Sequence, residues 1–109
     1  MPETSAKPSV FAARLLQARL RAGLNQTQLG VQAGMDPQVA SPRINQYEKG
    51  KHEPKLETAK RLAKVLGIPA AFLYTEDEQL AKLRLLGSEM SATERKKLVK
   101  QLEGEQAGR

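Results

Sequence analysis

The chain has 109 residues, which is enough for one domain with a modest core and too few for a second. Aromatic residues make up only 4% of it and tryptophan is absent, so the core has to be built from Leu, Val, Ile and Ala, which favours packed helices over a sheet. The net charge is +6; the lack of cysteine excludes disulfides, thiolate zinc sites and thiol nucleophiles, and no apolar run approaches the roughly 20 residues of a membrane span.

The N-terminal sequence predicts an arm followed by a strong helix. Residues 1–8 have no apolar stretch of the signal-peptide type, and we expect them to form a disordered arm. From Ser9 to Ala22 the spacing is helical, with Ser9 as the N-cap and Gly23 as the end. The apolar stripe expected to be buried consists of Phe11, Leu15, Leu16 and Leu20.

A short second helix is predicted after Leu24. Asn25 can cap its N-terminus, and Gln28 three residues later completes a capping box. Leu29 and Ala33 lie four residues apart on one face. Gly34 can adopt the left-handed conformation that ends such a helix.

Two signals compete to start the third helix. Asp36-Pro37 and Ser41-Pro42 both place proline at the first helical position after a capping side chain. Pro42 has no N–H and would break a helix that runs through it, so we expect the earlier signal to give at most a short turn. The third helix is therefore predicted over about residues 42–47.

This third helix is predicted to carry its polar residues outward. Ile44 and Tyr47 would face inward, and Arg43, Asn45 and Gln46 outward. Two short helices joined by a glycine turn, the second rich in amide and guanidinium groups, are typical of proteins that read the DNA major groove.

A fourth helix is predicted from about Leu56 to Leu66, and a short fifth helix follows it. Gly67 ends the fourth helix, and Ile68-Pro69 opens the fifth, which runs to about Tyr74. The residues expected to be buried on the fourth helix are Leu56, Ala59, Leu62, Ala63 and Leu66. The sequence contains no strand signal and no internal repeat, so the predicted fold class is all-α.

The tail contains two capping-box patterns and therefore two more predicted helices. Thr75-x-x-Glu78 would start a helix over about residues 76–86, and Ser91-x-x-Glu94 one over about 92–103, with Gly87-Ser88 as the joint. Their leucine stripes consist of Leu80, Leu83, Leu86, Leu98 and Leu102. Neither stripe is broad enough for an independent core, so the helices have to pack on the preceding body, on each other or on a second subunit. Residues 104–109 are expected to be frayed.

The positive charge is concentrated before the tail. Residues 1–75 carry a net charge of +6, whereas acidic and basic residues balance over residues 76–109. An excess of positive charge on the segment with the two short helices is expected of a domain that meets DNA phosphates. The alternative for such a charge excess is an ordinary solvated surface.

Many residues between Phe11 and Tyr74 follow a characteristic order and spacing. They are Arg19 four before Gly23, Leu24-Asn25-Gln26, Leu29, Ala33-Gly34, Ile44, Glu48-Lys49-Gly50-Lys51, Pro54 and Leu62-Ala63-x-x-Leu66-Gly67. This segment resembles the lambda-repressor-like (XRE) helix-turn-helix family. The resemblance implies a five-helix DNA-binding domain over residues 9–75. The two helices predicted from the capping boxes then form a C-terminal extension at 76–103, a possible dimerisation element. Two departures are the longer turn between Gly34 and Ile44 and the presence of Gly30 where the family commonly has alanine.

Three residues of the third helix are the main candidates for contacts with base edges: Ser41, Arg43 and Gln46. A guanidinium fork matches O6 and N7 of guanine, and a glutamine amide matches N6 and N7 of adenine. Asn45 is a weaker candidate, because each step along a helix rotates a side chain by about 100°.

A second group of residues is expected to contact DNA phosphates. Asn25 and Gln26 lie at the start of the second helix, where the helix N-terminus also favours an anion. Lys49, Lys51 and Lys55 follow the third helix and would neutralise phosphates without reading sequence. Each of these side chains has the alternative of being merely solvated.

The resemblance also implies one structural ion pair. In the family, an arginine at the position of Arg19 pairs with a glutamate at the position of Glu48, which ties the first helix to the end of the recognition helix. Such a fork would fix helix orientation more than it adds stability. The alternative is that the two charges lie on the surface and never meet.

The sequence offers little support for catalysis. His52 is the only histidine and is expected to be exposed rather than to bind a metal. There is no glycine-rich phosphate loop before a helix, and the acidic residues are dispersed along helix faces. We therefore expect no enzyme, no cofactor and no metal site.

Two functions remain open. In the first, the chain is a cytoplasmic transcriptional regulator, a repressor that binds double-stranded DNA at a palindromic operator as a homodimer. In the second, it is an antitoxin-type protein that binds a partner protein and its own promoter. The capped, leucine-striped tail favours the first, since a folded tail that pairs with itself suits a homodimer; a multiprotein bridging factor is a distant third.

Overall fold

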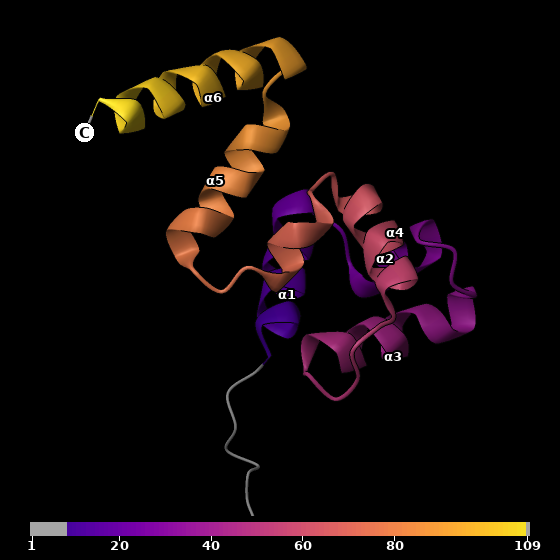
Figure 1. Cartoon of the computed structure of the whole chain (residues 1–109). Coiled ribbons are helices and arrows are strands. Elements are labelled where there is room, and N and C mark those ends of the chain that lie inside the picture. Colours follow the sequence, from indigo (N-terminus) through magenta and orange to yellow (C-terminus); the bar gives the residue numbers. More distant parts are fainter. Residues whose placement is uncertain (1–8, 109) are drawn as a thin grey trace, which may run out of the picture.

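The computed structural model describes residues 9–108, which form an all-α structure (Figure 1). The elements within this range are α1 (Val10–Ala22), α2 (Gln26–Gln32), α3 (Pro37–Glu48), α4 (Leu56–Leu66), the 3-10 helix η2 (Ala70–Tyr74), α5 (Glu78–Glu89) and α6 (Ala92–Ala107). The predicted fold class is confirmed, with η2 in place of the expected fifth helix. The expected disordered arm at residues 1–8 lies outside the described residues.

The first two helices start at the predicted caps. Ser9 Oγ accepts a hydrogen bond from the Ala12 N–H at 3.1 Å, and Gly23 ends α1 in the left-handed region with φ of 72°. At α2 both halves of the capping box form: Asn25 Oδ1 accepts from the Gln28 N–H at 2.7 Å, and Gln28 Oε1 accepts from the Asn25 N–H at 2.9 Å. These starts are predictable because each is decided by residues within three positions of the cap.

The predicted start of the third helix is wrong, because α3 begins at Pro37 and not at Pro42. Asp36 Oδ1 accepts from the Gln38 N–H at 2.8 Å, and Pro37 takes the first helical position. Pro42 lies inside the helix on its exposed side. Its missing N–H removes one backbone hydrogen bond, and the cap together with complete burial of Ala40 holds the first turn in place.

The core is built by α1 to α4 and η2, with contributions that differ in part from the expected stripes. Leu16, Leu20 and Leu56, which were expected to be buried, are 38%, 63% and 58% exposed. The largest fully buried side chains are Leu15, Leu29, Ile44, Leu62, Phe72 and Leu73. Alanines replace the missing leucines at the closest helix contacts, as at Ala18 of α1.

Helix α5 starts later and ends later than predicted. Its N-cap is Asp77, whose Oδ1 accepts from the Leu80 N–H at 2.8 Å. Thr75 is buried instead, and its hydroxyl donates to the Ala71 carbonyl at 2.7 Å. Gly87-Ser88 is part of α5 rather than the joint, which lies at Met90.

Helix α6 starts at the predicted capping box and is longer than predicted. The Glu94 N–H donates to Ser91 Oγ at 3.1 Å, and the Ser91 N–H donates to Glu94 Oε1 at 2.8 Å. The bond from the Ser91 backbone N–H lowers the pKa of the Glu94 carboxyl. The helix continues to Ala107, so the expected fraying from residue 104 is wrong for residues 104–107.

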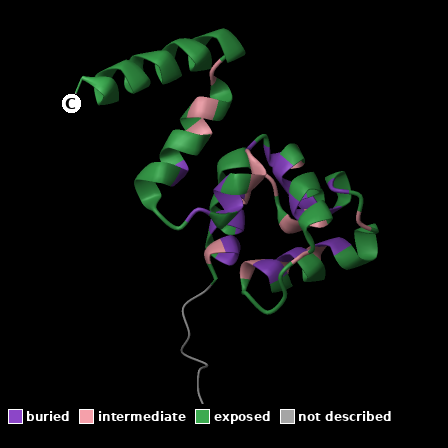
Figure 2. Ribbon diagram, viewed as in Figure 1, coloured by how far each residue is buried: buried purple, intermediate pink, exposed green. Residues whose placement is uncertain are grey.

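The last two helices form an arm that leaves the body (Figure 1). Ala81 of α5 is buried against the core, but none of the residues of α6 is buried, and Figure 2 shows α6 exposed along its length. The radius of gyration is 16.5 Å, against about 13 Å for a compact chain of this size. Intramolecular packing therefore accounts for the inner face of α5 and not for α6. Within residues 9–108, no helix combines the length and apolar character needed to cross a membrane.

Candidate nucleic-acid interface

Helix α3 buries one face and exposes the opposite one. Ala40, Ile44 and Tyr47 are buried in the core. The exposed positions of the other face are Gln38, Val39, Pro42, Arg43 and Gln46. Of the predicted base readers, Arg43 and Gln46 lie on this face. The earlier start of α3 adds Gln38, which the sequence interpretation had left in a turn.

The other two predicted base readers face α2 instead. The Ser41 hydroxyl donates to Gln26 Oε1 at 3.1 Å. Gln26 Nε2 donates to Asn45 Oδ1 at 3.2 Å and to Glu48 Oε1 at 3.1 Å. An amide has two N–H donors, and both of those on Gln26 are used here. The structure thus places Ser41, Asn45 and Gln26 in a network between helices rather than on the exposed face.

Arg19 and Glu48 extend this network to α1. Arg19 Nε donates to Glu48 Oε2 at 2.5 Å, and a second guanidinium nitrogen donates to Glu48 Oε1 at 3.0 Å. A third bond runs from Arg19 to the Leu24 carbonyl at 3.0 Å. The side chains are only 12% and 6% exposed, and the hydrogen bond to Glu48 raises the pKa of Arg19. The fork implied by the family resemblance is present, and it fixes the angle of α3 relative to α1 and α2.

The three lysines proposed for phosphates lie beyond the C-terminal end of α3. Lys49, Lys51 and Lys55 are all exposed, and the ion pairs recorded among residues 9–108 do not include them. Asn25 is also exposed, although its Oδ1 already serves as the cap of α2. Its Nδ2 group remains a donor that can reach an anion at the start of the helix.

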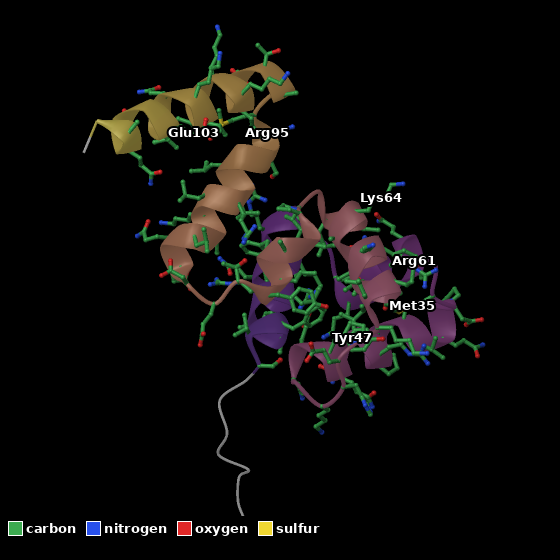
Figure 3. All side chains as sticks on the ribbon, viewed as in Figure 1. Met35, Tyr47, Arg61, Lys64, Arg95 and Glu103 are labelled. Carbon is green, nitrogen blue, oxygen red and sulfur yellow. The ribbon has the colours of Figure 1, made fainter. Side chains whose placement is uncertain are left out.

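Arg43 lies between two shallow hollows of the surface. One is lined by Gln46, His52 and Lys55, and the other by Val39 and Arg61 of α4, among others. Figure 3 shows Arg61 and Tyr47 on the same side of the helical body. Arg61 is thus a further exposed cation near α3, which sequence periodicity alone did not connect with it. His52 is exposed, and no cluster of potential metal ligands occurs among the residues that the structure describes.

Arg14 is a structural residue that the sequence interpretation missed. Its side chain is 6% exposed and lies over the Phe72 ring, 5.4 Å from the centroid. Arg14 Nε donates to the Thr75 carbonyl at 2.8 Å, and Nη2 donates to the Glu76 carbonyl at 2.9 Å. Its burial could have been predicted from helical spacing, because Arg14 lies three residues after the buried Phe11 and therefore on the same face of α1. This clamp fixes the segment that leads from the body into α5.

Comparisons with known proteins agree with this geometry. A sequence model of the helix-turn-helix family matches residues 15–73. The cryptic phage CTXphi transcriptional repressor RstR of Vibrio cholerae is 34% identical over 87 residues, which cover 72% of this chain and 73% of that protein. The crystal structure of the transcriptional regulator BswR superposes with a TM-score of 0.81 at 43% identity, and covers 85% of this chain and 92% of that one.

Proposed function

Since the chain belongs to the XRE-type helix-turn-helix family and is a DNA-binding transcriptional regulator, we propose that it is a repressor that binds a palindromic operator as a homodimer. The matched region contains α2 and α3, the two helices that a helix-turn-helix protein presents to DNA.

The exposed face of α3 is the observation that carries this proposal. Arg43 and Gln46 project from a helix whose opposite face is locked to α1 and α2 by the Arg19–Glu48 fork and the Gln26 network. A base reader has to be held rigidly, because discrimination between base pairs depends on hydrogen-bond geometry. Gln38 lies five residues before Arg43 and extends the proposed reading surface by about one and a half turns toward the N-terminus of α3.

Lysines and the start of α2 would hold the DNA backbone on either side of α3. Lys49, Lys51 and Lys55 supply exposed positive charge after the helix, and Asn25 supplies a donor at the start of α2. These contacts would provide affinity and register, and the α3 side chains would provide sequence preference.

Two observations support a homodimer. One helix of this length contacts few base pairs, so useful specificity comes from two copies on half-sites about one helical turn apart. The arm formed by α5 and α6 carries leucines that are about half exposed, namely Leu80, Leu83, Leu86 and Leu102. Repression is proposed by analogy with the Vibrio cholerae relative, which is named as a repressor.

The proposal is tested by selecting binding sites from random duplex DNA with the full chain and then measuring stoichiometry by sedimentation. We expect an inverted repeat with half-sites one helical turn apart, occupied by two chains. Duplexes with a single half-site should bind far more weakly. A selected site without two-fold symmetry, bound by one chain, would contradict the homodimer and favour the antitoxin-type alternative, in which the arm meets a different protein.

A further inference from the structure

Helix α6 is sixteen residues long and none of its residues is buried, although Arg95 near its start donates hydrogen bonds to the Gly87 and Met90 carbonyls. Leu98, Val99 and Leu102 are 37%, 52% and 49% exposed. Their spacing of one and four residues places them on one stripe of the helix. A capped helix with an apolar stripe is marginal on its own in water, so this one requires a partner surface.

The charges of α6 are divided between its two halves. Arg95, Lys96 and Lys97 lie in the first half together with Glu94, Lys100 lies just past the midpoint, and Glu103 and Glu105 lie in the second half. Figure 3 shows Arg95 near the start of the helix and Glu103 toward its end. An identical helix that runs antiparallel would therefore bring the basic residues 95–97 near Glu103 and Glu105 of the second copy at both ends, with opposed helix dipoles.

We infer that the arm dimerises through an antiparallel pair of α6 helices, with the two-fold axis between Val99 and Lys100. This inference rests on the homodimer proposed above and names the surface that forms it. The occupant of the α6 stripe is a second copy of the same stripe.

One pair of charges specifies this register. Lys96 and Glu103 are seven residues apart, so they lie on the same edge of the stripe, about 10 Å from each other along the axis. They form no ion pair within the described residues. In an antiparallel pair each edge meets its own copy, and an axis between Val99 and Lys100 sets Lys96 level with Glu103 of the second copy, twice by symmetry.

The stripe itself also favours the antiparallel direction. In this register Leu98 lies within one residue, about 1.5 Å along the axis, of the level of Leu102 of the second copy, and Arg95 lies equally close to the level of its Glu105. A parallel pair would instead place Arg95 beside Arg95 of the second copy within the stripe, where like charges repel.

The test is a charge-reversal and mixing experiment on the full chain. Lys96→Glu and Glu103→Lys should each weaken dimerisation by about tenfold or more, because two attractive pairs become repulsive. An equimolar mixture of the two variants should regain wild-type association as a heterodimer, since each reversed charge then meets its complement. Sedimentation with one variant carrying a mass tag measures the hybrid, and circular dichroism checks that both variants keep their helix content.

Lys97→Glu is the matched control, because it reverses the same charge on the opposite side of α6 and should leave association unchanged. A mixture that associates no better than the single variants, or a Glu103→Lys variant that dimerises more tightly, would overturn the antiparallel pair while leaving a homodimer standing. A wild-type chain that is monomeric at operator-binding concentrations would overturn both the pair and the proposed homodimer.

Discussion

Gly30 of α2 lies against Ala40 of α3 with no room for a side chain between them. A Cβ built on Gly30 would lie 2.5 Å from Cβ and 2.9 Å from Cα of Ala40. The backbone of Gly30 has no positive φ, so the residue is required by the close approach of two helices and not by its conformation. Both departures from the family pattern thus have one cause: α3 starts at Pro37, and its added first turn brings Ala40 onto α2.

We predict that Gly30→Ala destabilises the protein. Overpacking a tight contact costs about 1–3 kcal/mol, which exceeds the gain of up to about 1 kcal/mol from replacing glycine inside a helix. Urea denaturation measures the difference in free energy of unfolding. Gly87→Ala in α5 is the control, because nothing lies within 4 Å of the added Cβ there and the variant should be neutral or more stable.

Pairing Gly30→Ala with Ala40→Gly extends this test. If the contact alone causes the loss, the double variant should recover part of it, because the contact with the Ala40 Cβ is removed while the one with Cα at 2.9 Å remains. Equal stability of Gly30→Ala and Gly87→Ala would show that α3 can shift at little cost and that the contact does not constrain it.

Replacing single side chains on the exposed face of α3 should change sequence preference rather than general affinity. Arg43→Ala and Gln46→Ala should each cost about 1–3 kcal/mol at one base pair, and Gln38→Ala should relax a position further from the centre of the same half-site. Site selection on random duplexes measures this, with Gln101→Ala on α6 as the control. An unchanged consensus for Arg43→Ala would remove that residue from the reading surface.

The lysines after α3 should act on all DNA sequences alike. Lys49→Ala and Lys51→Ala should weaken binding and make the plot of log affinity against log salt shallower by about one unit per lost contact. Lys82→Ala on α5 removes the same charge away from α3 and should leave the slope as it is. If Lys49→Ala keeps the wild-type slope and affinity, that lysine does not touch DNA.

The arginine that anchors the arm should tolerate no replacement, including lysine. Arg14→Lys keeps the charge but cannot reach both the Thr75 and Glu76 carbonyls, and leaving buried carbonyls unpaired costs about 1–3 kcal/mol. Arg21→Lys is the comparison, because Arg21 pairs with Glu89 on an exposed surface, where such pairs are worth at most about 1 kcal/mol. Thermal unfolding of the two variants should differ clearly, and equal melting temperatures would mean that the clamp is dispensable.

Local signals in the sequence predicted the helices better than they predicted which side chains are buried. The caps at Ser9, Asn25 and Ser91 were predictable because their hydrogen bonds close within three residues. The start of α3 was not, because the choice between Pro37 and Pro42 depends on the burial of Ala40 against α2, a contact between segments. Thr75 likewise has the sequence pattern of an N-cap, but its side chain is buried and donates to the Ala71 carbonyl instead.

In the candidate site, too, features set by local sequence were predicted and features set by contacts between helices were not. Arg43 and Gln46 were placed correctly on the exposed face, because their position relative to buried Ile44 follows from helical spacing alone. Asn45 was predicted to face outward and Ser41 to contact bases, but both bond to Gln26, and these bonds depend on how α2 crosses α3. The family resemblance supplied the Arg19–Glu48 fork, which periodicity could not connect across 29 residues.

Removing α6 should separate folding from assembly. A chain that ends at Met90 loses none of the buried residues of the body, so the unfolding free energy of its monomer should stay within about 0.5 kcal/mol of that of the full-length monomer, as for surface changes in general. Its operator affinity should fall steeply, because two half-sites are then bound independently and the effective concentration that links them is lost. Gel-shift titration against duplexes with one and two half-sites measures this loss.

A chain that ends at Tyr74 is the contrasting variant. It also removes buried Ala81 and the carbonyls to which Arg14 donates, and it should be less stable as well. Undiminished dimerisation of the chain ending at Met90 would move the interface from α6 to the leucines of α5.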